Sequence, residues 1–443
     1  MENNPLAREF TPGAILRFAL PNMVMMVFMS LYTIVDGMFI SRFVGELALS
    51  ATNMFYPVTS MQYAVGIMLG TGGSAVIAWK LGRGEKQEAK EDFTAITILA
   101  LLVGVVVTAV CLPQLSPILR LLGTSPAQMP IAEIYAGILL WFAPMLFLQV
   151  LYQAFFVTAG KPTLGMVVSV SGGIANIVLD YFFMGPLHMG VRGAALATGI
   201  GYSIPAVVGV AYFSLARHGT LHFVKCRFHP KTLLRACTNG SSEMVSNAAM
   251  AVTTFLFNVI FMWFWAENGV AAITILSYFQ FVFSAIFIGF SMGVAPIVSY
   301  KFGAQDKKQL KRIFRLGMVF VAVCSVAVYI LSRLTLRFSL AIFTDAGSPV
   351  YEIAMEGFAI YALQFLFMGT SIFASGFFTA LNNGVVSAAI SLSRTFLFLV
   401  GSLLLLPALW DKTGVWFAVP VAELLGLAVS IAFLLWGRKR YGY

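Results

Sequence analysis

Twelve apolar stretches run through this chain, each long enough to form a helix that crosses a membrane. A spanning helix needs about 20 mostly apolar residues, because a helix rises about 1.5 Å per residue and the hydrocarbon layer is about 30 Å thick. The predicted spans cover residues 14–40, 53–79, 93–114, 132–158, 164–184, 191–215, 237–265, 270–300, 313–340, 351–380, 385–407 and 415–436. We therefore expect an all-α integral membrane protein.

Charged residues are too scarce for a surface that faces water. Only 10% of the 443 residues are charged and 59% are hydrophobic, whereas a soluble domain carries about 25% charge. Lipid must therefore be the solvent for most of the chain. Residues 1–11 are polar and of mixed charge, so no cleaved signal peptide is expected. The four cysteines show no CxxC spacing, so neither a disulfide framework nor a zinc site is expected.

The basic residues are distributed unevenly between the two sides of the predicted spans. With the N-terminus placed in the cytoplasm, and with residues near the end of a span counted with the adjoining segment, that side holds 21 of the 28 Lys and Arg and the other side holds six. The remaining one, Arg394, lies deep within a span. The positive-inside rule therefore predicts that both termini are cytoplasmic. The same bias accounts for the net charge of +10, so we expect no nucleic-acid partner.

A motif recurs about half a chain apart, at the ends of two predicted spans. Lys80-Leu81-Gly82 matches Lys301-Phe302-Gly303, and the acidic and basic residues that follow also correspond. A repeat of this kind in a hydrophobic chain is typical of two-lobed membrane transporters. Six spans per repeat give both lobes the same orientation, which predicts a pseudo-two-fold axis along the membrane normal. The expected parts are an N-terminal lobe, a basic cytoplasmic linker that includes Arg217 to Arg235, and a C-terminal lobe, at residues 1–215, 216–236 and 237–443.

Four charged residues stand out inside predicted spans, where a charge costs about 2.5–3.5 kcal/mol on insertion scales and needs a partner or a water-filled cavity. Two of them, Arg394 and Glu423, lie at similar depths on neighbouring helices of the second lobe. We interpret these two as a structural ion pair, with direct substrate contact as the alternative.

The other two, Asp36 and Asp180, lie at a comparable depth in the first lobe. Asp180 and Thr198 lie about 11 and 16 Å below one turn, and Asp36 lies about 12 Å below its own loop. Asn176 shares a helix face with Asp180, four residues away. Two close carboxylates cannot both ionise cheaply, which favours a proton or sodium site. The alternative is that neighbouring hydroxyls and amides satisfy each acid separately.

Pro21 lies fifteen residues before Asp36 in the first predicted span. Proline removes a backbone hydrogen bond and is expected to interrupt and kink the helix there. A bend coupled to the state of Asp36 would make Pro21 a hinge, and a fixed kink is the alternative.

The sequence resembles the multidrug and toxic compound extrusion (MATE) family over nearly its whole length, and in detail the prokaryotic DinF/MepA-like branch. The motifs that carry the resemblance are Val35–Ile40 with Gly45, Lys80–Gly82, Gly160–Pro162, Asn176–Asp180 and Gly193–Thr198. The resemblance implies a first-lobe cation site made by Asp36, Asn176, Asp180 and Thr198, lined by Tyr135, with Pro21 as the branch's helix 1 proline. A second-lobe sodium site is not implied, because Ala248–Ala251 replaces the glutamate of the NorM-like branch; this favours protons.

We therefore expect a secondary antiporter in the cell (inner) membrane that exports amphipathic, cationic organic compounds by alternating access. The coupling ion would be a proton, or a sodium ion bound at Asp36 and Asp180, and no other cofactor is expected. Weak candidates for the substrate cavity are Met29, Tyr32, Gln62 and Gln153. The expected partners are these compounds and membrane lipid, and we expect a monomer. The rival hypothesis is a flippase for lipids or polysaccharide precursors. An enzyme is not expected, because the sequence has no HExxH motif, no histidine cluster and no sizeable soluble domain.

Overall fold

The computed structural model describes residues 4–216, 219–226 and 229–443, and in these ranges every regular element is a helix. The first half contains α1 (Pro12–Phe43), α2 (Glu46–Asn53), α3 (Tyr56–Gly82), α4 (Lys86–Cys111), α5 (Leu115–Leu121), α6 (Met129–Trp141), α7 (Ala143–Thr158), α8 (Pro162–Met184) and α9 (Val191–Leu215). The second half contains α10 (Pro230–Gly303), α11 (Lys307–Phe343), α12 (Pro349–Tyr361), α13 (Gln364–Ala380), α14 (Gly384–Leu392), the π-helical η1 (Ser393–Phe398) and α15 (Leu399–Tyr441).

The helices form twelve transmembrane spans, as the sequence predicts. Eight helical segments of the described chain are long and apolar enough to cross a membrane. Two of these hold two spans each, because the backbone leaves helical geometry at Ala266 in α10 and at Trp410 and Asp411 in α15. Two bent pairs, α6 with α7 and α12 with α13, supply the remaining spans.

The bent pairs correct two predicted spans. Residues 132–158 and 351–380 read as single helices, but the chain turns by 55° between α6 and α7 and by 57° between α12 and α13. In the first pair, Pro144 lies in the first turn of α7, and the residue before that helix, Phe142, has left helical geometry. A proline is favoured at such a start, because its missing N–H would have had no partner there.

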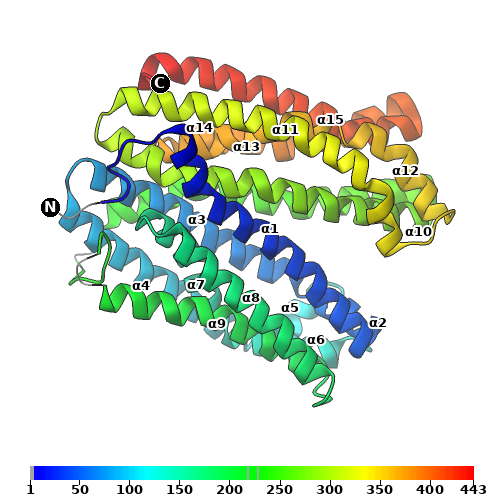
Figure 1. Ribbon diagram of the computed structural model, residues 1–443. Helices are drawn as coiled ribbons and strands as arrows, with labels where there is room; N and C mark the ends of the chain where they lie inside the picture. The colour runs from blue at the N-terminus through cyan, green and yellow to red at the C-terminus, as the bar shows by residue number, and fades with distance from the viewer. Residues whose placement is uncertain (1–3, 217–218, 227–228) are drawn as a thin grey trace.

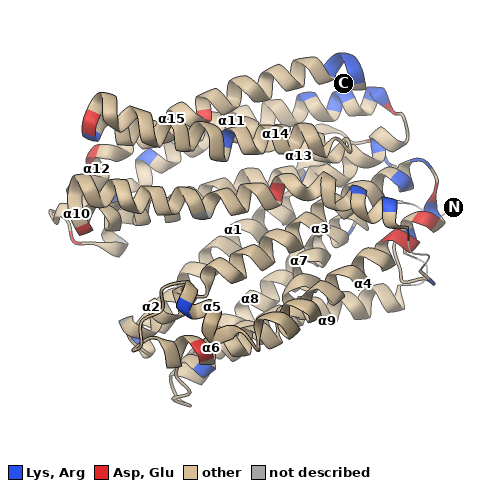
Figure 2. Cartoon of the chain, turned by 180° about the vertical axis from the view of Figure 1, so that it is seen from behind, with Lys and Arg blue, Asp and Glu red and all other residues tan. Residues whose placement is uncertain are grey.

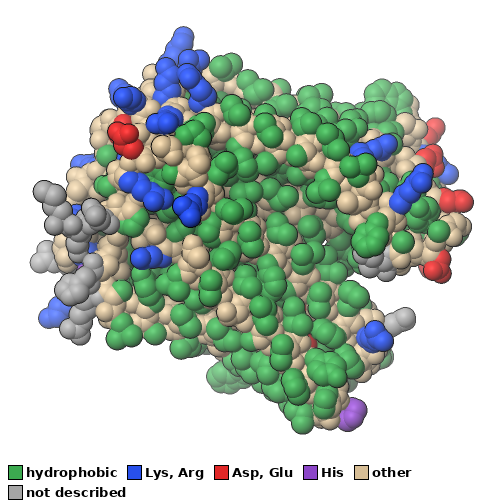
Figure 3. Space-filling view, viewed as in Figure 1, with side chains coloured by type: hydrophobic (Ala, Val, Ile, Leu, Met, Phe, Trp, Pro, Cys, Tyr) green, Lys and Arg blue, Asp and Glu red, His purple; other side chains and the backbone are tan. Residues whose placement is uncertain are grey.

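The spans form two lobes of six, built from α1–α9 and from α10–α15 (Figure 1). The lobes lie together at the end that holds both chain termini and diverge towards the other end. In the space-filling view, the molecule is hollowed between the lobes at that far end (Figure 3). Lys and Arg gather at the end with the termini (Figure 2). The predicted linker between the lobes also runs there, but its residues 217–218 and 227–228 lie outside the described chain.

Glycines let the two lobes touch backbone to backbone at the end with the termini. A Cβ atom on Gly82 of α3 would lie 2.1 Å from the carbonyl oxygen of Tyr300 in α10, and one on Gly303 would lie 2.1 Å from that of Trp79. Small residues permit this close approach of membrane helices. Gly82 and Gly303 are equivalent positions of the internal repeat, so the duplicated motif forms both halves of one symmetric contact.

A second symmetric contact lies deeper between the lobes. A Cβ atom on Gly72 would lie 1.9 Å from the carbonyl oxygen of Ala236 and 2.7 Å from the backbone nitrogen of Gly240. The equivalent residue of the other repeat, Gly293, packs in the same way on Ala19 of α1, with a distance of 3.0 Å to its Cα. Together these glycine contacts hold the lobes together at one end, while the other end stays apart.

The N-terminal segment, residues 4–11, crosses this junction. Leu6 and Phe10 are fully buried in the core of the second lobe. The Lys301 ammonium donates a hydrogen bond of 3.0 Å to the carbonyl oxygen of Ala7. Pro5 packs against Gly160 of the first lobe, with its Cβ 2.6 Å from the position that a glycine Cβ would take. The segment therefore contacts both lobes.

An ion pair beside this junction gives a stability prediction. Lys80 is 2.6 Å from Asp92 and 3.0 Å from Glu88; Lys80 and Asp92 are both buried, while the Glu88 side chain is exposed. Asp92→Asn should lower the free energy of unfolding by about 1.5–3 kcal/mol, because Lys80 loses its buried carboxylate partner and keeps only the exposed Glu88. Thermal unfolding in detergent would measure the loss.

Replacing both Lys80 and Asp92 with apolar residues should restore much of this stability, because the buried Lys80 ammonium is then absent as well. Lys80→Met combined with Asp92→Leu is the variant to compare. A double variant less stable than Asp92→Asn would show that the pair itself, and not the unpaired charge, accounts for the effect.

Candidate functional site

The two first-lobe acids meet between α1 and α8. The carboxyl groups of Asp36 and Asp180 interact directly. Asp180 is fully buried, and Asp36 is half-buried. Within the described part of the chain, neither oxygen of Asp180 has a hydrogen-bond donor, and the Oδ1 atom of Asp36 also has none. An ionised carboxylate only accepts hydrogen bonds, so a shared proton or a bound cation is what this arrangement can hold.

Glycines bring the helices of the site close together. A Cβ atom on Gly172 of α8 would lie 2.7 Å from the carbonyl oxygen of Gly201 in α9, so these two helices almost touch there. One on Gly173 would lie 2.6 Å from the ring of Phe28 in α1. These contacts lie about two turns from Asp180, and they set the separation of the three helices that carry the polar groups.

Asn176 and Thr198 join α8 to α9 beside the acids. The Asn176 amide nitrogen donates to the Thr198 hydroxyl oxygen at 3.4 Å, and that hydroxyl donates to the carbonyl oxygen of Ala194 at 3.0 Å. The Oδ1 atom of Asn176 is buried without a hydrogen-bond donor among the described residues. This bonding pattern leaves the Asn176 oxygen available, next to the carboxyl pair, to contact a cation.

Tyrosines surround the acidic pair. Tyr135 of α6 lies against Thr198 and within electrostatic range of both carboxyl groups. The structure therefore brings together all five residues proposed for the cation site: Asp36, Tyr135, Asn176, Asp180 and Thr198. The pair of acids and the three neutral oxygen-bearing side chains suit a proton or a hard cation such as sodium. No group of three His, Cys, Asp or Glu side chains placed to hold a metal ion occurs in the described residues.

Two further tyrosines of this cluster were missed by the sequence reasoning. Tyr32 interacts electrostatically with Tyr202 of α9, with Tyr63 of α3 and with both acids. Tyr202 was detectable, because it follows Thr198 by four residues and so shares its helix face. Tyr63 gave no such signal, since it reaches the cluster from another helix.

The four candidates for the substrate cavity separate in the structure. Gln153 of α7 lies in a narrow pocket where the two lobes meet, and it also contacts Tyr63. Tyr32 belongs to the tyrosine cluster instead. Gln62 is buried in α3 and Met29 is half-buried in α1, and neither is among the described residues that line that pocket.

The second lobe holds an ion pair between Arg394 of η1 and Glu423 of α15. The Nε atom of Arg394 donates to both Glu423 oxygens, at 2.9 and 2.7 Å. The Arg394 stem passes over Gly426, where a Cβ atom would lie 3.1 Å from the Arg394 Cγ. Glu423 therefore forms a close ion pair with this arginine, in the arrangement expected of a structural pair.

The structure does not break α1 at Pro21, contrary to the predicted interruption. The helix is continuous from Pro12 to Phe43. A proline frees only one carbonyl group, and neighbouring helices let membrane helices tolerate it. The next residue, Asn22, ties this turn to the second lobe through a 2.9 Å hydrogen bond from its amide to the carbonyl oxygen of Gly289. The role of Pro21 as a hinge stays a prediction.

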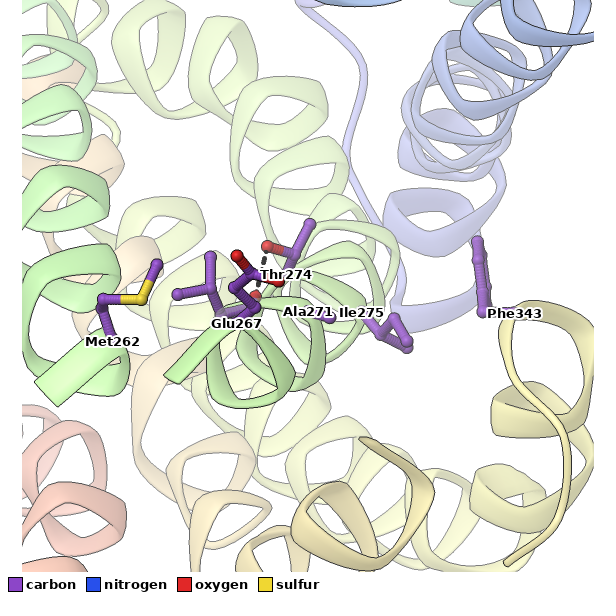
Figure 4. A pocket seen from close by; sticks show the side chains of 7 residues that line it. Met262, Glu267, Ala271, Thr274, Ile275 and Phe343 are labelled. Atoms are coloured by element: carbon purple, nitrogen blue, oxygen red, sulfur yellow. Dashed lines mark hydrogen bonds between the residues drawn. The ribbon is translucent and has the colours of Figure 1, made fainter. Parts of the chain in front are cut away.

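A separate hollow lies near the far end of the second lobe, around the break in α10 (Figure 4). Its lining is mainly apolar and includes Met262, Ile275 and Phe343. Glu267 is its one charged side chain among the described residues, and the Thr274 hydroxyl is bonded to the carbonyl oxygen of Val270 at 2.7 Å. Because it lacks convergent polar groups, this hollow is a weaker candidate than the acidic site.

Comparison with known proteins gives matches along nearly the whole chain. The family model described as MatE matches residues 21–182 and 244–404. The multidrug export protein MepA of Staphylococcus haemolyticus (strain JCSC1435) is 25% identical over 431 residues, which cover 96% of this chain and 94% of that protein.

Solved structures share the fold. An outward-facing multidrug resistance MATE family transporter of the MOP superfamily superposes with a TM-score of 0.92 at 23% identity, covering 100% of this chain and 98% of that one. A MOP superfamily transporter from Pyrococcus furiosus, described as having a binding pocket of reverse polarity that suggests a different function, gives a TM-score of 0.90 at 22% identity, covering 99% of this chain and 97% of that one.

Proposed function

Since this chain belongs to the MatE family of membrane transporters, we propose that it exports amphipathic, cationic organic compounds in exchange for protons. The observation that carries the coupling proposal is the contact between Asp36 and Asp180, in which three of the four carboxyl oxygens are buried without a donor among the described residues. A proton between the two carboxyl groups supplies the missing donor. Its loss leaves two like charges in a low-dielectric site. Proton binding and release therefore change the free energy of the first lobe.

The charge distribution supports an orientation for this exchange. The end that holds both termini carries most of the Lys and Arg (Figure 2), so we place it in the cytoplasm. The lobes then part towards the outside, and the conformation described here is the one that releases substrate and receives protons.

The cycle follows from these two features. A proton from outside binds the acidic pair, and the charge change alters how α1 packs against α8, with Pro21 as the hinge. Substrate leaves through the open end between the lobes. The lobes then close outside and part at the cytoplasmic end, where the proton leaves and new substrate binds. The voltage contributes about 2.3 kcal/mol per charge per 100 mV, in addition to the pH gradient.

Proteoliposomes with an imposed gradient test this proposal. Acidifying the face opposite the termini should drive a fluorescent cationic dye such as ethidium towards that face, because protons then enter the acidic pair from that side. A sodium gradient alone should not drive it. If sodium alone drives the dye, Asp36 and Asp180 are sodium ligands. If neither gradient moves it, the multidrug proposal is wrong.

The flippase alternative now has less support. A flippase would need a basic residue to hold an anionic headgroup, and Arg394, which lies within a span of the second lobe, is the candidate. Glu423 binds the Nε atom of this arginine with both oxygens, so the charge is compensated within the protein. Loss of dye transport with retained lipid movement would favour the flippase over the drug exporter.

A further inference from the structure

The narrow pocket between the lobes contains one ionisable side chain among the described residues, Glu243 of α10. The acidic pair of the first lobe is not part of this pocket. Most of the remaining side chains that line it are small or polar and come from both lobes, including Asn22, Thr71, Ser74, Gln153, Ser291 and Thr379. A carboxyl group among neutral hydroxyls and amides makes this a polar pocket with one group that can carry a negative charge.

The charge of Glu243 is not cancelled by the second-lobe arginine. Arg394 is close enough to interact with it electrostatically. However, both oxygens of Glu423 accept from the Arg394 Nε atom at 2.9 and 2.7 Å. When both carboxyl groups are ionised, these three residues together carry one net negative charge, and Glu243 is the member of the three that lines the pocket.

A charge within a membrane protein is costly unless something compensates it. Glu243 also lies where α10 meets the first lobe, about 20 Å along the helix from its start at the end with the termini. When the lobes part at that end, the residues on both sides of the pocket face the opening. A positively charged compound that enters there would meet Glu243 and compensate it.

We propose that Glu243 makes the pocket between the lobes select positively charged organic compounds over neutral ones of the same shape. This inference rests on the proposed export of organic compounds and names the residue that recognises their charge. Arg394 and Glu423 act as positioning residues, because their pairing keeps the arginine from neutralising Glu243.

Equilibrium binding to the purified full chain can test this inference with two probes of similar shape. Tetraphenylphosphonium carries a permanent positive charge, and triphenylphosphine oxide is neutral. Glu243→Gln should weaken tetraphenylphosphonium binding about tenfold, equivalent to about 1.4 kcal/mol. Binding of the neutral probe should be unchanged, which also shows that the variant is folded. Glu267→Gln, in the hollow of Figure 4, makes the same chemical change outside the pocket and should leave both affinities unchanged.

The positioning pair provides a second, independent measurement. Glu423→Gln alone should also weaken tetraphenylphosphonium binding, since the freed charge of Arg394 then compensates Glu243. The double variant Arg394→Gln with Glu423→Gln should regain the preference for tetraphenylphosphonium over the neutral probe, because no arginine then compensates the charge of Glu243.

The outcomes separate this inference from the proposed function. If Glu243→Gln keeps the preference of the wild type, or loses both probes equally, Glu243 does not select charge, even though the wild type still exports cationic dye. If the wild type neither binds tetraphenylphosphonium nor exports dye, the proposed function is wrong, and this inference falls with it.

Discussion

Asp36→Asn should reduce dye efflux driven by a pH gradient to the level of passive leak. The amide cannot take up and release a proton, so the acidic pair can no longer change its charge during the cycle. Asp180→Asn should have the same effect, since the two carboxyl groups form one unit. Efflux from proteoliposomes under an imposed pH gradient measures both.

The same substitution should not destabilise the protein. The side-chain amide that Asp36→Asn introduces can donate to the Asp180 oxygens, which lack a donor among the described residues. One such hydrogen bond contributes about 1 kcal/mol, so the melting temperature should stay constant or rise. Asp345→Asn, at an exposed position between α11 and α12, is the matched control and should transport normally. An Asp36→Asn protein that still couples efflux to protons would rule out this site.

Adding methyl groups at Gly82 and Gly303 should prevent the lobes from closing at the end with the termini. Each new Cβ atom would lie 2.1 Å from a backbone carbonyl oxygen of the other lobe, and backbone cannot yield as a flexible side chain can. The double variant Gly82→Ala with Gly303→Ala should therefore favour the conformation that is open at that end and should lose vectorial export.

A cysteine at Ser74 can report this change. The residue is buried in the pocket between the lobes. In a protein whose four natural cysteines are replaced, a membrane-impermeant maleimide applied from the side of the termini should label Ser74→Cys much faster in the glycine variant. Gly401→Ala is the control, because no atom among the described residues lies within 4 Å of its added Cβ. Equal labelling of both proteins would show that these glycines do not control closure.

The sequence predicted the spans well where loops contain polar residues, and less well where they do not. The break at Ala266 falls in a predicted loop, because Glu267 and Asn268 interrupt the apolar pattern. The bend at Phe142 does not, because apolar residues continue on both sides of it. Hydropathy measures how readily a residue moves from water into lipid, so it cannot detect a bend between two helices that are both apolar.

The candidate site, too, was only partly predictable from the sequence. The sequence placed Asp36 and Asp180 at a similar depth in the membrane. This depth follows from the position of the predicted turns and from the fixed rise of a helix per residue. The rotation of each helix about its axis stayed unknown from depth alone. Tyr63, which reaches the tyrosines around the acids from α3, was therefore beyond sequence reasoning. The packing that sets this rotation depends on glycine contacts between distant segments.

The burial of the N-terminal segment was not predicted, because its residues are mostly polar and of mixed charge. Leu6 and Phe10 are nevertheless fully buried. Their partners come from the second lobe, almost three hundred residues later in the chain. The backbone N–H of Phe10 donates to the side-chain oxygen of Gln309, and the carbonyl oxygen of Ala7 accepts from Lys301. No local pattern could indicate contacts at such a sequence separation.

This attachment has a consequence for biosynthesis. The ribosome makes residues 4–11 long before α10 and α11, so their binding surface is completed only after most of the intervening chain has entered the membrane. Until then Leu6 and Phe10 remain exposed to water, as contacts of high sequence separation always form late. Docking of the N-terminus therefore reports that the second lobe is assembled, and a bulky tag fused there would hinder the last step of maturation.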